Sequence, residues 1–598
     1  MITIDLETHG IQGNPIVLPP RPVGVAIKFD DAPATYLPWD ADTVNTLHNI
    51  WDGKEDLLFQ NGWGFDLQVL KQYAGLEYPD WQRVHDTMYL LFLADPYSPT
   101  LSLKPSAERY LEWNVGAKDE LQAWVMAHVP EARKAPSKWG AYICEAPFEI
   151  LSKYGADDAD MTRALYNRLS NMQGEAYDRE RRIAPVLTDA SKRGVRVDTT
   201  RLEEDIHRYS GVIKEVEDRL RGIVGDINLN SGAQLADALE TAGLVDPNDW
   251  VMTAKGSRST SKDNLAKVIK DHSLLDLLAY QSSLKTCMGT FMEPWLAEAN
   301  GGDGRVHTTW NQVRNREDGG KGTRTGRISS SGPNLANVSN EFTDPQGNPQ
   351  AMPVGLPSLP LCRVYLLPEE GHKWLKRDWS GQEFRILAHF EDGSLMESYA
   401  QDANYDAHAY GKGEISAITG VDYVRKEVKI TGFSIIYGSG VPGLSAQLKR
   451  PPADAMQIRS AYFRTFPGIE ELQRDTKRVG DSGGVITTWG GRQYPVEPPK
   501  IINGSLRNFG YKLLNYLIQG SAADQCKQVI GDWYYDIRDP QATLMTQVYD
   551  ELNISAPAED WERHMHDLKK AMNQDLFDVP MLSEGGVGDN WAELKECE

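Results

Sequence analysis

The hydrophobic pattern of this chain changes from strand-like to helical and back along its length. Up to about residue 175, strand-like and helical stretches are mixed, which is typical of an α/β domain. From about 177 to 285 the pattern is mostly helical, and residues 203–223 are predicted to form one long amphipathic helix. Residues 301–335 are rich in Gly, Ser, Arg and Asn, which predicts loops or irregular sheet.

The C-terminal half predicts a sheet whose strands are separated by helices. Short apolar strands are expected near Trp374, Leu544 and Leu552, and helices around 425–437 and 511–532. This order indicates one sheet with an inserted helical subdomain. At 598 residues the chain is also too long for a single hydrophobic core, so several domains are expected.

Acidic side chains gather on the predicted first strand and at two later positions. Apolar residues alternate with Asp5 and Glu7 in residues 1–7, so both carboxylates project from one face of the strand. Asp66 follows a Gly-Trp-Gly-Phe run, and Tyr154 and Asp158 lie four residues apart, on one face of a predicted helix. Converging carboxylates repel one another unless cations neutralise them, so the pattern favours a metal site. Taken alone, an Asp-x-Glu pair is more often a pair of solvated acids.

Two segments of the C-terminal half place carboxylates at strand ends. Residues 376–385 read Lys-Arg-Asp-Trp-Ser-Gly-Gln-Glu-Phe-Arg, with Asp378 directly after an apolar run. Residues 544–554 hold Asp550 and Glu551 between two β-prone stretches, which predicts a hairpin turn that faces Asp378. Such acids are suited to holding divalent metal ions. A lone Asp-Glu pair in a hairpin is more often a solvated turn.

Between these acids, four residues are spaced by four: Arg425, Lys429, Phe433 and Tyr437. Each step turns a helix by about 400°, so the four side chains form a stripe on one face. Two cations can neutralise a triphosphate, and two aromatic rings can stack beside a base pair. The Arg–Lys pair alone would equally fit an ordinary surface helix.

Composition limits the compartments in which the protein can act and the partners that it can bind. We find no run of about 18 apolar residues, and the N-terminus lacks the basic region and apolar core of a signal peptide. The five cysteines form no Cys-x-x-Cys pair, which disfavours a structural zinc site and favours a reducing compartment. The net charge of -22 leaves nucleic-acid binding open, because phosphate is bound by a local basic surface. Residues 305–327 hold six basic residues, including Arg316.

The N-terminal motifs resemble, in their order, the Exo I, Exo II and Exo III motifs of DnaQ-like 3′–5′ proofreading exonucleases. The resemblance extends to Asp86-Thr87-Met88 and to residues 102–111. It implies that four carboxylates bind metal and that a tyrosine orients the attacking water. By position, the metal ligands are Asp5, Glu7, Asp66 and Asp158, and the tyrosine is Tyr154. Asp157 is the neighbouring alternative, but the four-residue spacing from Tyr154 favours Asp158.

The segment at 376–385 resembles motif A of family A DNA polymerases, the relatives of the Klenow fragment. The usual family text is Asp-Tyr-Ser-Gln-Ile-Glu-Leu-Arg. The resemblance implies that Asp378 binds both catalytic metal ions and that Glu383 is the steric gate against a ribose 2′-hydroxyl. Trp379 and Gly381 depart from the family text, and we expect them to alter the fit near the sugar or the base.

The segment at 544–554 resembles motif C of the same family. It implies that Asp550 is the second metal ligand and Glu551 an auxiliary acid. Tyr549 stands where the family has His, and we expect it to lie near the primer terminus.

The stripe on the predicted helix resembles motif B, which binds the incoming nucleotide. It implies dNTP contacts from Arg425, Lys429, Phe433 and Tyr437, with Lys429 also placed to supply a proton to pyrophosphate. His408, in Asp-Ala-His, resembles a further phosphate contact. Phe433 replaces a tyrosine at the position linked to discrimination against chain terminators.

Two more segments resemble parts of the family that contact DNA. One is Thr-Arg-Thr-Gly-Arg-Ile-Ser-Ser at 323–330, followed by Pro-Asn-Leu; the other is residues 515–524. The resemblance implies that Arg327 contacts the minor groove at the primer end and that Asn515 and Gln519 probe template–primer geometry. Minor-groove acceptors occupy nearly the same place in every Watson–Crick pair, so these residues can check pair shape without reading sequence.

The resemblance implies an α/β and α+β multidomain protein. An RNase H-like 3′–5′ exonuclease domain is expected at 1–175 and a right-hand polymerase domain at 176–598. Within the latter we expect a thumb at about 190–300, a palm at about 301–400 and 520–598, and fingers at about 401–519. Because the motifs begin near Met1, a 5′ nuclease domain is not expected.

The implied activity is DNA-dependent DNA synthesis from a primer, with proofreading. The expected cofactor is Mg²⁺, two ions per active site, with Mn²⁺ as a substitute. The expected partners are template–primer DNA and dNTPs, without a membrane. The layout resembles a bacteriophage replicative enzyme, so we expect a monomer in the cytoplasm, that of the host cell if the protein is viral.

Three other functions remain as alternatives. A single-subunit RNA polymerase uses a related palm, but Glu383 and the exonuclease motifs count against it. A non-catalytic DNA-binding or scaffolding protein, or a nuclease with a degenerate polymerase half, should have lost a metal ligand. Every expected carboxylate is present.

Overall fold

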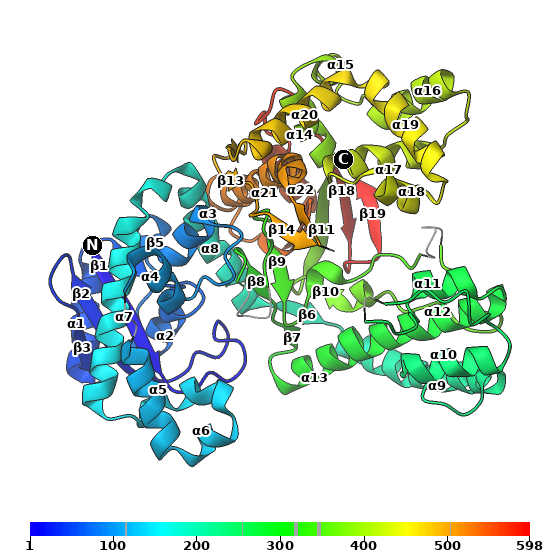
Figure 1. Cartoon of the computed structure of the whole chain (residues 1–598). Coiled ribbons are helices and arrows are strands. Elements are labelled where there is room, and N and C mark those ends of the chain that lie inside the picture. Colours follow the sequence, from blue (N-terminus) through cyan, green and yellow to red (C-terminus); the bar gives the residue numbers. More distant parts are fainter. Residues whose placement is uncertain (114–115, 254, 316–320, 344–348, 503, 598) are drawn as a thin grey trace.

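A computed structural model describes residues 1–113, 116–253, 255–315, 321–343, 349–502 and 504–597. Arg316, one of the six basic residues noted above, lies outside these ranges. The chain forms an N-terminal α/β unit beside a larger unit, in which helices project on two sides of a central sheet (Figure 1). Within the described ranges, no helix is both long and apolar enough to cross a membrane.

The N-terminal unit is built on a five-stranded sheet with the order β3-β2-β1-β4-β5. β1 runs antiparallel to β2 and parallel to β4. The strands are β1 (Ile2–Thr8), β2 (Pro22–Phe29), β3 (Thr35–Pro38), β4 (Leu57–Phe59) and β5 (Val84–Asp86). The helices are α1 (Ala41–Asp52), α2 (Asp66–Ala74), α3 (Thr87–Ala94), α4 (Leu103–Leu111), α5 (Gly116–His128), α6 (Pro130–Lys134) and α7 (Phe148–Arg168), with short 3₁₀ turns η1 (Trp81–Arg83), η2 (Pro136–Glu145) and η3 (Ser170–Met172). The predicted opening strand is confirmed.

The predicted helical stretch follows the N-terminal unit. Its elements are α8 (Glu175–Arg193), β6 (Val195–Val197), α9 (Thr199–Val224), α10 (Gly232–Thr241), α11 (Lys262–Val268), α12 (His272–Thr286), the π-helical turn η4 (Cys287–Met292) and α13 (Glu293–Gly301). α9 includes the predicted helix at 203–223 and extends it at both ends. Asp198 caps its N-terminus by accepting a hydrogen bond from the Arg201 amide. Its buried residues recur at intervals of four and seven, which makes one face apolar.

The central sheet of the larger unit has the order β16-β17-β11-β18-β19, and all its neighbouring strands are antiparallel. The strands are β11 (His372–Trp379), β16 (Thr543–Val548), β17 (Glu551–Pro557), β18 (Ser583–Gly588) and β19 (Leu594–Cys597). The predicted strands near 374, 544 and 552 therefore lie side by side. Smaller elements precede β11: β7 (Arg305–Val306), β8 (Thr309–Asn311), β9 (Ser329–Ser331), η5 (Leu335–Asn337), η6 (Cys362–Tyr365) and β10 (Leu366–Leu367). Those between 301 and 337 confirm the predicted irregular sheet in the described parts of the segment, 301–315 and 321–335; residues 316–320 lie outside the described residues.

The inserted helical subdomain lies between β11 and β16. It contains α14 (Gln382–Glu391), α15 (Ser394–Gln401), α16 (Ala407–Thr419), α17 (Arg425–Ile436), α18 (Val441–Leu448), α19 (Pro452–Thr465) and α20 (Pro467–Asp481). Two hairpins follow, β12 (Val485–Thr487) with β13 (Gln493–Pro495), and β14 (Lys500–Ile502) with β15 (Ser505–Arg507). Then come η7 (Gly510–Lys512), α21 (Leu513–Asp532) and η8 (Trp533–Ile537), while α22 (Trp561–Met572) follows β17. Both predicted helices are confirmed, although α17 ends one residue before Tyr437.

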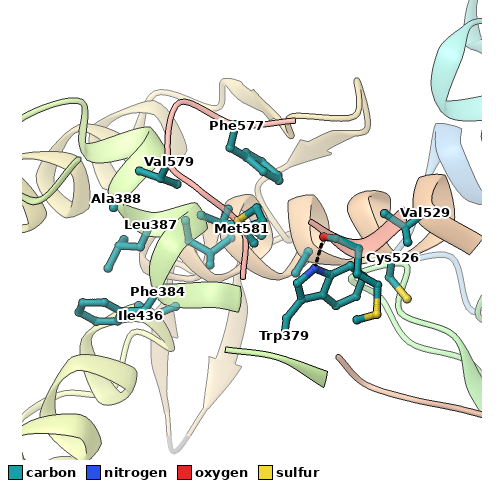
Figure 2. Packing of buried hydrophobic residues seen from close by; sticks show 14 of the residues in the cluster. Trp379, Phe384, Leu387, Ala388, Ile436, Cys526, Val529, Phe577, Val579 and Met581 are labelled. Atoms are coloured by element: carbon teal, nitrogen blue, oxygen red, sulfur yellow. Dashed lines mark hydrogen bonds between the residues drawn. The ribbon is translucent and has the colours of Figure 1, made fainter. Parts of the chain in front are cut away.

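A hydrophobic core lies behind the end of β11 (Figure 2). The Trp379 side chain is 3% exposed, and its indole Nε1 donates a hydrogen bond to the Met572 carbonyl at 2.8 Å. Successive side chains of a strand point to opposite faces, so Trp379 enters the core while Asp378 faces the other way. The expectation that Trp379 alters the fit near the sugar or base is therefore wrong. Gly381 caps α14 with a φ of 71°, a left-handed conformation that favours glycine.

Buried charges join the two units through α8. We call Glu180, Arg492, Asp524 and Lys527 the charge hub; each is at most 1% exposed. The Glu180 carboxylate accepts hydrogen bonds from Arg492 and Lys527, both at 2.6 Å, and Arg492 also bonds Asp524 at 2.9 Å. The Arg492 guanidinium lies 5.7 Å from the ring of Phe92 in α3. The hub thus connects α8, α21 and the N-terminal unit.

Candidate active sites

The N-terminal sheet brings three of the predicted metal ligands together. Ligand oxygens of Asp5, Glu7 and Asp158 all lie within 4.8 Å of one another. Alternation along β1 places Asp5 and Glu7 on one face, and α7 carries Asp158 across it. The prediction that these carboxylates converge is confirmed.

The fourth predicted ligand, Asp66, begins α2 beside the same strand. Its Oδ1 accepts a hydrogen bond from the Leu6 amide at 3.1 Å, between the two acids of β1. Asp86 shapes the loop that leads to Asp66, because its carboxylate accepts hydrogen bonds from the Asn61 and Gly62 amides at 2.9 and 2.8 Å. Asp86 thus positions Asp66 through the backbone.

Sequence reasoning missed one residue of this site, Lys104 of α4. Its Nζ lies 2.6 and 2.5 Å from the two carboxylate oxygens of Asp158, and 3.7 Å from the centre of the Tyr154 ring. The side chain is buried, and Ala107 on the same helix face is buried too. A lysine on the apolar face of a helix, next to motifs rich in acids, is the signal that could have found it.

The carboxylates of this site are not fully neutralised by the protein. Burial, followed by the charge of Asp158, raises the pKa of Asp5 from 3.8 to about 7, although Lys104 opposes the shift. Burial and the neighbouring acids also raise the pKa values of Glu7 and Asp66 well above their usual range. Hard oxygen donors with uncompensated negative charge fit Mg²⁺ or Mn²⁺.

In the larger unit, the sheet register brings the other two acidic segments together. Asp378 on β11 lies opposite Glu551 on β17. The Trp379 amide donates a hydrogen bond to the Asp550 carbonyl at 3.2 Å. Asp550 occupies the turn between β16 and β17, as the sequence predicts.

Asp378 has the electrostatic character of a metal ligand. Its Oδ1 is buried and has no hydrogen-bond partner among the described residues. Burial, then the charges of Asp550 and Glu551, raises its pKa from 3.8 to about 7, with Lys376 opposing. Burial also raises the pKa of Asp550. Oxygen donors of this kind fit divalent magnesium.

Glu551 differs from the two aspartates because both its carboxylate oxygens already have partners. Oε1 accepts hydrogen bonds from Asn553 Nδ2 at 2.8 Å and Trp591 Nε1 at 3.0 Å. Lys376 Nζ lies 3.2 Å from Oε2. Glu551 therefore anchors the sheet and adds negative charge near Asp378.

Tyr549 precedes Asp550 in the turn and has a strained backbone. Its φ is 57°, a left-handed conformation that is rare for a bulky residue. The ring is 51% exposed, and the Arg327 guanidinium lies 5.9 Å from its centre. Tyr549 thus displays an aromatic ring at the edge of the acidic site.

Glu383 is held in place by two other predicted site residues. Arg327 forms an ion pair with its Oε1, and the Tyr437 hydroxyl donates a hydrogen bond to its Oε2 at 3.1 Å. The Gln519 side chain also contacts the Tyr437 hydroxyl. The predicted steric gate, the end of motif B and two predicted DNA contacts therefore form one cluster.

The predicted dNTP-binding face lies on α17 and α16. Arg425 and Lys429 are exposed, whereas Val428 and Thr431 on the other face are buried. The Arg425 guanidinium bonds Asp406 at 2.8 Å. Burial, then the charges of Arg425 and Lys429, lowers the pKa of His408 to about 4, so its imidazole is neutral at pH 7.

The remaining predicted DNA contacts lie on α21. Asn515 and Gln519 are half-buried and one turn apart. In the part of the chain that the structure describes, Asn515 Oδ1 is buried without a hydrogen-bond partner. It is therefore available for a donor from a bound molecule.

Comparisons with known proteins agree with this geometry. The model of a family described as DNA polymerase family A matches residues 199–593. DNA polymerase I of Caldicellulosiruptor bescii is 30% identical over 427 residues, which cover 70% of this chain and 47% of that protein. DNA polymerase I of Bacillus subtilis is 26% identical over 94% of this chain and 61% of its own length. DNA polymerase DpoZ of Vibrio phage phiVC8 is 27% identical over 82% and 77%.

The chain is also similar to a solved structure over nearly its full length. That structure is the POL domain of Pol1 from M. smegmatis in complex with DNA primer-template and dNTP. The TM-score is 0.73, with 21% identity, 99% of this chain covered and 95% of that chain. The likeness confirms the predicted right-hand fold. The chain spans 47% and 61% of the first two relatives named above.

Proposed function

This chain belongs to DNA polymerase family A, and we propose that it extends a DNA primer with dNTPs along a template and removes nucleotides from 3′ ends at a second site. The observation that carries the polymerase proposal is the meeting of Asp378 and Asp550 at the end of the central sheet. The observation that carries the exonuclease proposal is the cluster of Asp5, Glu7 and Asp158.

In the polymerase site, Asp378 and Asp550 would hold Mg²⁺; in the exonuclease site Asp5, Glu7, Asp66 and Asp158 would do so. Bound there, the ions would supply activation of the primer hydroxyl or of a water, and would offset phosphate charge. Side chains of the protein bind the nucleotide and the DNA and orient the attacking water.

The face of α17 binds the incoming nucleotide. Arg425, Lys429 and His408 contact the triphosphate, and Lys429 donates a proton to the departing pyrophosphate. Phe433 and Tyr437 stack beside the nascent base pair. Glu383, which accepts a hydrogen bond from the Tyr437 hydroxyl, excludes a 2′-hydroxyl and thereby selects dNTPs.

Two residues of α21 and one residue in the turn between β16 and β17 contact the DNA. Asn515 and Gln519 contact the template–primer pair in the minor groove, and Tyr549 contacts the primer terminus. Arg327 would exchange its contact with Glu383 for one with the primer end.

In the exonuclease site, Tyr154 orients the attacking water. Lys104 holds the Asp158 carboxylate in place through its two short contacts. We place this site in a domain at 1–175 and the polymerase in 176–598, with the thumb, palm and fingers divided as the sequence predicts. We further propose a monomeric replicative enzyme of bacteriophage type that acts in the cytoplasm of its host.

Primer extension tests both activities in one assay. A 5′-labelled primer on a longer template is incubated with Mg²⁺, with and without dNTPs. We expect lengthening with dNTPs and shortening without them. Failure to lengthen an open template under any dNTP condition would refute the polymerase proposal.

Variants separate the two sites. Asp378→Asn or Asp550→Asn should reduce extension by about a thousandfold or more while shortening persists. Asp5→Ala with Glu7→Ala should do the converse. Parallel loss of both activities in either variant would contradict two independent sites.

A further inference from the structure

The edge strand β3 places a tyrosine, Tyr36, beside the proposed exonuclease site. β2 pairs with both β1 and β3, and the register aligns Asp5 with Ala26 and Ala26 with Tyr36. Residues directly opposite one another in paired strands project from the same face of the sheet. Tyr36 therefore projects from the face that carries Asp5 and Glu7.

Small residues on β2 leave room for the Tyr36 side chain to lie across the sheet toward Glu7. The register pairs Glu7 with Gly24, two residues before Ala26. A Cβ atom on Gly24 would overlap the Tyr36 hydroxyl and the ring carbon that carries it. The hydroxyl thus lies over Gly24. Because neighbouring strands are only about 5 Å apart, it lies one strand away from Glu7.

The helix α7 covers the same place. It packs across β1, β2 and β3 (Figure 1). A Cβ atom on Gly155 would lie 2.7 Å from Tyr36 Cδ2 and 3.6 Å from Glu7 Cγ. The Tyr36 ring and the Glu7 side chain therefore approach the same residue of α7, which directly follows Tyr154 and precedes Asp158 by three positions.

The Tyr36 hydroxyl is a buried donor without an acceptor. The residue is 5% exposed, and its Oη has no hydrogen-bond partner among the described residues. Glu7 is also buried, and its carboxylate accepts no hydrogen bond from the described part of the chain. Leaving a buried polar group without a partner costs free energy, so each such group in a folded protein requires an explanation.

Electrostatics keeps the proton on this hydroxyl. Burial, then the charges of Glu7 and Asp5, raises the pKa of Tyr36 above its usual value. The hydroxyl therefore remains a donor at any pH at which the acids are ionised. Carboxylates that bind a metal are themselves oriented by hydrogen bonds from groups behind them, and such groups are part of the design of a metal site.

We propose that Tyr36 is a positioning residue of the exonuclease site, whose hydroxyl donates a hydrogen bond to the ionised Glu7 carboxylate and thereby directs its other oxygen toward the metal. Rotation about the Glu7 side-chain bonds brings an oxygen within reach of the hydroxyl, because both side chains already meet at Gly155. The proposal rests on the proposed exonuclease activity. It adds a residue outside the motifs that carry the other acids.

Metal titration of the full-length protein tests this role. All proteins compared carry Asp378→Asn with Asp550→Asn, so that Mn²⁺ binding measured by calorimetry reports the exonuclease site. Tyr36→Phe removes only the hydroxyl and should raise the Kd for Mn²⁺ about tenfold, because such outer hydrogen bonds change metal affinity by about 10–100-fold. Tyr166→Phe is the matched control, since this buried tyrosine of α7 directs its hydroxyl to His85 at 3.1 Å. Its Kd should stay within about twofold.

Activity and stability separate positioning from a structural role. With Tyr36→Phe, shortening of single-stranded DNA should require about tenfold more Mg²⁺ for half of the maximal rate. The rate at saturating Mg²⁺ should stay within about threefold of the rate without this change. In the presence of a chelator the Tm should not fall, because the variant loses a buried donor that has no partner.

Three results would overturn the role of Tyr36. Equal metal dependence with and without Tyr36→Phe would remove it. A higher KM for DNA, with the metal dependence unchanged, would show that the hydroxyl contacts the substrate instead. A lower Tm with chelator, and a rate that excess Mg²⁺ does not restore, would make Tyr36 a structural residue. Absence of 3′ shortening in the unchanged protein would instead refute the proposed exonuclease activity, and the calorimetric comparison would still decide the role of Tyr36.

Discussion

At the scale of single residues, Tyr549 combines backbone strain with an exposed ring. Strained residues of this kind cluster at functional sites, where the surrounding structure maintains them. Its φ of 57° costs a non-glycine residue about 1–2 kcal/mol. Because the ring is half exposed, little of the cost is recovered by burial.

Replacements of Tyr549 should separate strain from function. Tyr549→Asn keeps a residue that tolerates the left-handed region, so the free energy of unfolding should change by less than about 1 kcal/mol. Tyr549→Val introduces a β-branched residue, so it should lower the free energy of unfolding by about 1–2 kcal/mol more than Tyr549→Asn does. Chemical denaturation measures both values. Primer extension should fall in both variants, since both remove the ring; retained extension would contradict a role at the primer terminus.

Glu383 gives a second prediction at this scale. Glu383→Ala opens the space that its side chain fills, so incorporation of ribonucleotides relative to deoxyribonucleotides should rise at least about tenfold. Glu383→Gln keeps the length but loses the ion pair with Arg327, and should retain most of the discrimination. The ratio of kcat/KM for dGTP and GTP measures the effect. An unchanged ratio in Glu383→Ala would remove the steric-gate role.

At the scale of elements, sequence periodicity was sufficient where contacts are local or lie along one strand. Alternation placed Asp5 and Glu7 on one face, and the four-residue steps placed motif B on one side of α17. The pairing of Asp378 with Glu551 also followed from two predicted strands.

Contacts between distant elements could not be predicted in this way. Lys104 reaches Asp158 from another helix, 54 positions away in sequence. The Trp591 indole donates a hydrogen bond to Glu551, which lies 40 positions away in sequence. Trp379 lies in the core and not near the sugar or base, because alternation along β11 directs it to the face opposite Asp378. Such contacts depend on tertiary packing, which local patterns do not encode.

The contact between Lys104 of α4 and Asp158 of α7 predicts how replacing Lys104 changes the stabilisation by Mg²⁺. Lys104→Met removes the cation beside Asp158, so repulsion among the carboxylates should lower Tm without metal. The added rise in Tm on saturation with Mg²⁺ should be larger than in the unchanged protein, because the ion now supplies that charge. Thermal denaturation measures both. Lys153→Met on α7 is the control, since Lys153 is exposed and pairs with Glu120; an equal effect in both variants would contradict the role of Lys104.

The two carboxylate clusters predict that stability falls with rising pH in the absence of metal and that Mg²⁺ offsets this fall. The folded pKa of Asp378 and of Asp5 is raised from 3.8 to about 7, so the folded state holds protons that the unfolded chain releases. Their contribution to stability is present below about pH 4 and is lost as pH rises to about 7. Above pH 7 the ionised acids repel, and Mg²⁺ relieves the repulsion.

Mg²⁺ should therefore raise Tm more at pH 8 than at pH 5.5. Calorimetry at both values, with Mg²⁺ and with a chelator, measures the increments. The variant Asp5→Asn with Asp378→Asn should show a smaller difference between the two pH values. If Mg²⁺ raised the Tm of the unchanged protein equally at both pH values, protonation of these acids would not be coupled to metal binding.

At the scale of the whole molecule, the charge hub predicts a large cost for a small change. Glu180→Gln leaves Arg492 and Lys527 buried with one carboxylate fewer, which should lower the free energy of unfolding by about 3–5 kcal/mol. Denaturant unfolding followed by tryptophan fluorescence measures the loss. Glu175→Gln, at an exposed position of the same helix, should leave stability nearly unchanged. Similar midpoints for both variants would show that the charge hub does not contribute to stability.

The charge hub also affects how a primer end moves between the two proposed sites. If α8 and its buried ions hold the two proposed catalytic centres at a fixed separation, a primer end must travel between them by itself. The choice between adding and removing a nucleotide then depends on how readily the terminal base pairs fray. Primer ends rich in A·T pairs would be trimmed sooner than those rich in G·C pairs, without any rearrangement of the protein.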